Sequence, residues 1–238
     1  MDALAQERMS DRLRTGFVGG RQGTLVAGLA GVLGFVITII GGTIAGEFDI
    51  PEPTASPATV AEYYRTLDFD QMYWGISVEM LGYLLLVVFS VKLAHVLGAA
   101  ERGSGWGGLL VLAGAVMIWA VGFASYAPLL VGGYRATHGG LSDEGYLLLN
   151  DMQAAFYPIW LFMAGLFILP AGIIMLRTAL FPHWLGWAGV ALGPALFLVG
   201  VLAPTSLRLA DLVAGLWAVW ILAAAIVMLA RLDTFSDA

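Results

Sequence analysis

Apolar residues along the chain fall into six long runs separated by short polar stretches. The runs cover roughly residues 24–46, 72–97, 106–130, 146–176, 184–203 and 209–230. Each run is long enough to cross the hydrocarbon core of a bilayer as an α-helix, which takes about 20 residues. The pattern therefore predicts an all-α, polytopic membrane protein folded as a six-transmembrane-helix bundle.

The polar stretches between the runs predict how the chain is organised. Residues 1–23 are charged and lack the short apolar core of a signal peptide, so the first run is expected to be retained as a span. Residues 24–231 are then a single transmembrane domain, and residues 232–238 form a tail. The loop at 47–70 starts with three prolines and ends in TVAEYYRTL, which favours two helical turns. Such a loop is either a lid or docking surface, or a passive connection.

Basic residues near the ends of the runs predict the orientation. With the N-terminus inside the cell, most of the eleven basic residues lie on the cytoplasmic side, where such residues concentrate. This group comprises Arg8, Arg12, Arg14, Arg21, Lys92, Arg102, Arg177 and Arg231. Both termini are therefore expected in the cytoplasm (N-in/C-in) of a multi-pass protein of the cell membrane, with Lys92 reaching the inner headgroups.

Composition narrows the possible chemistry. The chain is 60% hydrophobic and 12% charged, and it has no cysteine, which excludes disulfides and thiolate chemistry. The net charge of −6 is unfavourable for nucleic acid and mildly favourable for cations. We find no enzyme motif and expect no cofactor, while the lipid bilayer is the one certain partner.

Three acidic residues inside predicted spans are the main functional signal: Glu79, Asp151 and Asp211. A charge at such a depth is costly and usually faces the bundle interior or a cavity. Each acid is expected to lie about 5 to 10 Å inward from the outer end of its helix. We therefore predict an outward-facing acidic pocket that binds or transports a small cation, a proton or an amine-containing solute. Its expected lining adds the polar residues Tyr83, Asn150, Gln153 and Arg208.

A purely structural interpretation of the same acids stays open. Arg208 and Arg135 could pair with Asp211 and Asp151 near the interface, with Glu79 protonated or bonded to a tyrosine. The three histidines fall on both sides of the membrane, so they cannot form one buried metal site, and the identity of any metal is open.

Small residues in the first run suggest a second kind of function. Gly31, Gly34, Gly42 and Gly46 lie at spacings that allow a close helix approach, within the chain or with a partner. The alternative function is a non-catalytic subunit of a membrane complex, or a homo-oligomer, that docks through this face. A third is the substrate-binding component of a multi-subunit importer.

The segment LRTALFPHWLGWAGVALG resembles part of a known protein family. Its Pro182, Trp184, Leu185 and Gly186 match a Pro-x-Trp-Leu-Gly run that opens the fifth helix in a family of uncharacterised bacterial six-helix membrane proteins, common in actinobacteria. The resemblance implies the six-helix fold and no particular activity.

Overall fold

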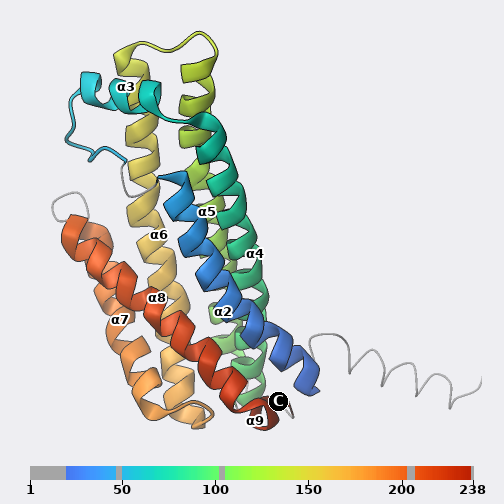
Figure 1. The fold of residues 1–238 in the computed structure, drawn as a ribbon. Coiled ribbons are helices and arrows are strands. Elements are labelled where there is room, and N and C mark those ends of the chain that lie inside the picture. The colour runs from blue at the N-terminus through green and yellow to red at the C-terminus, as the bar shows by residue number, and fades with distance from the viewer. Residues whose placement is uncertain (1–19, 47–49, 102–104, 203–206, 237–238) are drawn as a thin grey trace, which may run out of the picture.

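The computed structural model describes residues 20–46, 50–101, 105–202 and 207–236, and all regular structure within them is helical (Figure 1). Six helices are long and apolar enough to cross a membrane, which confirms the predicted fold class. The helices are α2 (Gly20–Ala45), α3 (Pro57–Thr66), α4 (Phe69–Ala100), α5 (Trp106–Thr137), α6 (Asp143–Thr178), α7 (His183–Leu202), α8 (Leu207–Ala230) and α9 (Leu232–Ser236).

The six spans differ greatly in length. Helices α4, α5 and α6 have 32, 32 and 36 residues, whereas α7 has 20. At 1.5 Å per residue, α7 is about 30 Å long, which matches the hydrocarbon core, whereas α6 is about 54 Å long. The three long helices therefore project from the layer that α7 spans, and their projecting ends carry α3 (Figure 1).

We name the two ends of the bundle after the short helices they carry, the α3 end and the α9 end. The start of α2 lies at the α9 end, because the Thr24 hydroxyl donates to the Phe235 carbonyl at 3.2 Å. The Arg21 guanidinium also pairs with Asp233 at 3.1 Å. Residues 232–236, expected to belong to a tail, thus form α9 and pack on the bundle. That the α9 end faces the cytoplasm stays a prediction.

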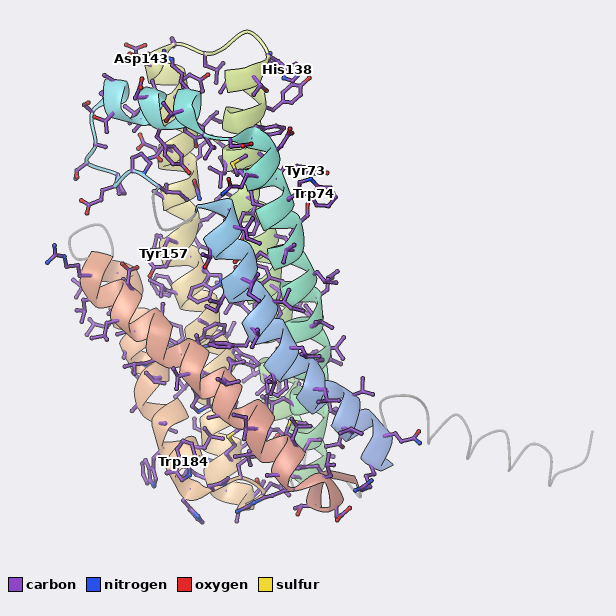
Figure 2. The ribbon with its side chains drawn as sticks, in the orientation of Figure 1. Tyr73, Trp74, His138, Asp143, Tyr157 and Trp184 are labelled. Carbon is purple, nitrogen blue, oxygen red and sulfur yellow. The ribbon has the colours of Figure 1, made fainter. Side chains whose placement is uncertain are left out.

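Exposed aromatic residues mark two levels along the bundle. Trp106, Trp184 and Trp187 are exposed near the α9 end, and Tyr73 and Trp74 are exposed on α4 towards the α3 end (Figure 2). Tyrosine and tryptophan favour both membrane interfaces. From Trp74 to Ala100, 26 residues of α4 cover about 39 Å, which suits a bilayer with its headgroup regions.

The glycines of α2 bring it against other helices of the same chain. A Cβ on Gly31 would lie 2.6 Å from Ala225 of α8, and one on Gly34 would lie 2.9 Å from the Gly82 carbonyl of α4. Gly42 is also buried, and Gly46 ends the helix with φ +73°. Of the two alternatives for this face, packing within the chain is the one that the structure shows at Gly31 and Gly34, because α4 and α8 cover them.

Helix α3 caps the projecting ends of α5 and α6, and it confirms the helical turns expected in the loop. Ser56 is its N-cap, with the Ser56 hydroxyl accepting from the Thr59 N–H at 3.2 Å. The Tyr64 ring stacks on Tyr146 of α6 at 5.2 Å, and Arg65 pairs with Asp143 at 2.6 Å. Burial, aided by neighbouring Tyr63, raises the pKa of the Tyr64 hydroxyl above its usual value.

The buried apolar residues form two separate clusters. The larger cluster fills the membrane-spanning part and includes Leu86 of α4 and Leu161 of α6. The smaller cluster, which we call the head cluster, lies under α3 and includes Ile76 of α4 and Tyr146 of α6. The site described below lies in the interval between these clusters.

Candidate functional site

Polar side chains occupy the interval between the two apolar clusters. On α4 they are Glu79 and Tyr83, on α5 Tyr126, and on α6 Asn150 and Gln153, a set that we call the polar layer. Tyr83 packs against both clusters, which places it at their junction. The sequence predicted four of these five residues as site residues, and Tyr126 was not among them.

Glu79 is the buried acid of the polar layer, with 3% of its surface exposed. It follows Ile76 and precedes Leu86 on the buried face of α4, so it points into the bundle as predicted. Gly41 of α2 packs directly on the Glu79 backbone. Glu79 is five residues beyond the exposed Trp74, which places it about 7.5 Å further from the headgroups.

Asn150 and Gln153 supply two amide oxygens on one face of α6. Asn150 is 2% exposed, and its amide nitrogen donates to the Pro51 carbonyl at 3.4 Å. The segment before α3 therefore covers Asn150. In the part of the chain that the structure describes, neither Asn150 Oδ1 nor Gln153 Oε1 accepts a hydrogen bond. Buried oxygens without a donor are unfavourable, and a ligand that brings donors removes this cost.

Tyr83 and Tyr126 join α4 to α5 within the layer. The Tyr126 hydroxyl donates to the Tyr83 hydroxyl at 3.2 Å, and the two rings lie 6.1 Å apart. The Tyr83 ring also packs on Trp119 of α5, whose indole N–H donates to Ser90 at 3.2 Å. These contacts hold α4 and α5 together at the level of the layer.

Asp211 lies on α8, separate from the buried part of the layer. Its carboxylate is exposed and accepts a hydrogen bond of 2.6 Å from the Tyr157 hydroxyl of α6. Arg208 is also exposed and forms no ion pair with Asp211 in the described part of α8, so the structure does not show the pairing that the alternative interpretation required.

Aromatic rings surround this hydrogen bond. Tyr157 stacks near Trp160 with centroids 6.4 Å apart, and Trp160 meets Trp217 of α8 edge-on at 4.9 Å. The Trp217 indole N–H is buried and has no hydrogen-bond partner among the described residues. We call Asp211, Tyr157, Trp160 and Trp217 the α6–α8 site. The sequence did not predict Trp160 and Trp217 as site residues, because their contact depends on how α6 and α8 meet.

The three predicted acids do not form one metal site. Asp151 is exposed, whereas Glu79 is buried. No group of three or more His, Cys, Asp or Glu side chains in the described ranges lies close enough to hold a metal ion. Whether Glu79 and Asp211 act on one ligand stays a prediction.

Comparison with known families adds the identity of the chain. The family model described as "Domain of unknown function (DUF4386)" matches residues 26–232. The chain belongs to the DUF4386 family. No curated protein and no solved structure matches it significantly. The resemblance to an uncharacterised membrane-protein family is thereby confirmed, and the match covers every membrane-spanning helix of this DUF4386 protein except the first six residues of α2.

One basic residue of the DUF4386 chain departs from its expected place. Lys92 does not reach the headgroups: it is 2% exposed, and its Nζ atom has no hydrogen-bond partner among the described residues. It lies eight residues before Ala100, about 12 Å from the α9 end of α4. The expectation was wrong because neighbouring helices cover the face of α4 that carries Lys92. The lysine side chain is not long enough to extend past them to the headgroups.

Proposed function

We propose that this membrane protein binds a small cation or an amine-containing solute in the polar layer, with Glu79 as the charged ligand. The observation that supports this most is the burial of Glu79 in the interval between two apolar clusters, at membrane depth. Ionisable residues inside a membrane are costly and usually mark a substrate or ion pathway.

The neighbouring groups suit a ligand that carries hydrogen-bond donors. Asn150 Oδ1 and Gln153 Oε1 are buried acceptors without donors, and an ammonium group brings only donors. The Tyr83–Tyr126 pair adds hydroxyl oxygens from α4 and α5. A carboxylate, two amide oxygens and hydroxyls together favour a cation over an anion or an apolar solute.

Access from the α3 end is the next part of the proposal. The segment from Ile50 to Ser56 leads into α3, and its Pro51 carbonyl is held by Asn150 through one long hydrogen bond. Helix α3 itself is fixed more firmly by the Arg65–Asp143 pair and the Tyr64–Tyr146 stack. We expect residues 50–56 to move when a ligand enters, while α3 stays in place.

The test compares two carboxylate-to-amide variants of the purified protein. Glu79→Gln keeps the size of the side chain and removes its charge, and Asp70→Asn does the same at an exposed position of α4. We expect methylammonium to raise the unfolding midpoint of the wild type and of Asp70→Asn in a saturable way, and to leave Glu79→Gln unchanged. Equal stabilisation of all three proteins would disprove the role of Glu79. Loss of expression in Glu79→Gln would instead make it an architectural residue.

The two alternative functions predict a different result. A structural subunit, or the substrate-binding component of an importer, would retain a stoichiometric protein partner in mild detergent. The glycine face of α2 is not available for such a partner, since Gly31 and Gly34 pack within the chain. Co-purification therefore separates these functions from the ligand-binding proposal.

A further inference from the structure

The α6–α8 site has features that the polar layer lacks. Asp211 is exposed, and its hydrogen bond to Tyr157 uses Oδ1 and leaves Oδ2 available to a ligand. Tyr157 and Trp160 are each half-buried and lie with nearly parallel rings, at an interplanar angle of 17°. A carboxylate beside aromatic rings is an arrangement that binds quaternary and other organic ammonium groups.

Side chains connect α6 and α8 at this site. Helix α8 packs mainly against α2 and α7. Long side chains therefore bridge α6 and α8, through the Tyr157–Asp211 hydrogen bond and the Trp160–Trp217 contact. Figure 2 shows Tyr157 beside the start of α8.

The depth of the site suggests where the ligand comes from. Asp211 is four residues after Leu207, the first residue of α8, so it lies about 6 Å from that end of the helix. Figure 2 shows Tyr157 further from the α3 end than Trp74, so an ammonium bound beside Asp211 would lie inward of the headgroup level that Trp74 marks. Further along α8, Leu212, Leu216 and Val219 expose apolar side chains to the membrane. An apolar chain attached to the ammonium would lie against them.

From this geometry we infer that the α6–α8 site binds the ammonium group of an amphiphile, a molecule with an ammonium head and an apolar chain. The inference rests on the proposed function and deepens it by naming the ligand class. Asn150, Gln153, Tyr157 and Trp160 follow one face of α6, so the site and the polar layer are continuous along that helix. The ammonium is either a choline or ethanolamine headgroup of a membrane lipid or a free alkylammonium.

The test uses the full-length protein in phosphatidylglycerol nanodiscs, with hexyltrimethylammonium as the probe and tryptophan fluorescence as the readout. Hexanol has the alkyl chain without the charge, and tetramethylammonium has the charge without the alkyl chain. Together they separate the two contributions to binding. We expect saturable binding of hexyltrimethylammonium, weaker binding of tetramethylammonium and none of hexanol. Asp211→Asn should weaken the binding at least tenfold. Trp160→Leu should weaken it about two- to thirtyfold, as expected for one cation–π contact, with Trp160→Phe in between.

Two comparisons decide the outcome. If Asp211→Asn is folded by circular dichroism and binds hexyltrimethylammonium as tightly as the wild type does, the inference is overturned. The proposed function would then be tested by Glu79→Gln alone. Loss of affinity in Asp211→Asn but not in Glu79→Gln would support the α6–α8 site, while the role of Glu79 is decided separately by the methylammonium test. Phosphatidylcholine nanodiscs identify the source: weaker binding than in phosphatidylglycerol means that the lipid headgroup occupies the site, and equal binding means that a free amphiphile does.

Discussion

Replacing Lys92 by methionine should make the protein more stable. Lys92 is 2% exposed and its Nζ atom has no hydrogen-bond partner among the described residues, so folding buries a polar amine without compensation. A lysine at the centre of a membrane helix costs roughly 2.5–3.5 kcal/mol on insertion scales, and less towards the ends. Lys92 lies about 12 Å from the end of α4, so we expect the Lys92→Met substitution to stabilise the folded protein by roughly 1–3 kcal/mol. Methionine has a similar length and fills the same space without the charge.

The assay is thermal unfolding in detergent, followed by circular dichroism. For a chain of this size, about 1 kcal/mol corresponds to roughly 2–4 °C, so Lys92→Met should raise the midpoint by roughly 2–12 °C. Leu93→Met is the control, because Leu93 is the adjacent buried residue and a swap of this kind costs less than about 1.5 kcal/mol. A lower midpoint for Lys92→Met than for the control would refute the reasoning, because it would mean that the amine is stabilised by its surroundings.

Three further predictions concern packing, the head cluster and topology. Gly41→Val should lower stability by roughly 1–3 kcal/mol, because any Cβ there meets the Glu79 backbone, whereas Gly215→Ala, with nothing within 4 Å, should be tolerated in the same melts. Tyr64→Phe should be neutral or stabilising, since the buried Tyr64 hydroxyl has no partner among the described residues. Tyr146→Phe should lower the free energy of unfolding by about 1 kcal/mol, because the Tyr146 hydroxyl accepts from the Leu141 N–H at 3.3 Å. Equal effects of Tyr64→Phe and Tyr146→Phe would contradict these roles of the two hydroxyls. Reporter fusions should give an external signal at residues 60 and 140 and a cytoplasmic signal at 182 and 238, and a cytoplasmic signal from residue 60 would overturn the orientation.

The fold was predictable because membrane-spanning helices are recognisable in a sequence by their length and hydropathy. All six predicted spans are present as helices in the structure. Ser142 caps α6, and its hydroxyl accepts from the Gly145 N–H at 3.2 Å. The excess length of α4, α5 and α6 was less visible, because their projecting ends are polar or aromatic and lie outside the apolar runs. Helix α9 was missed, since five residues without a run of apolar positions give no periodic signal.

The site was only partly predictable because side-chain contacts depend on how helices rotate about their axes. The depth of Glu79 and the small residues around it indicated an inward direction, and the structure buries it. The partner of Asp211 was not predictable in the same way. Arg208 lies close to it in sequence, but Tyr157, 54 residues away, donates the hydrogen bond. Lys92 was misjudged for a related reason, because its distance from the helix end suggested snorkelling while its face of α4 is covered.

The most direct test of the central claim is equilibrium binding of radiolabelled methylammonium to the purified protein, measured by scintillation proximity. If Glu79 holds a cation in the polar layer, the wild type and Asp70→Asn should each show saturable binding of one methylammonium per chain. Glu79→Gln, folded and expressed like the wild type, should show none. Saturable binding of equal affinity in Glu79→Gln would contradict the claim, as would the absence of saturable binding in the wild type.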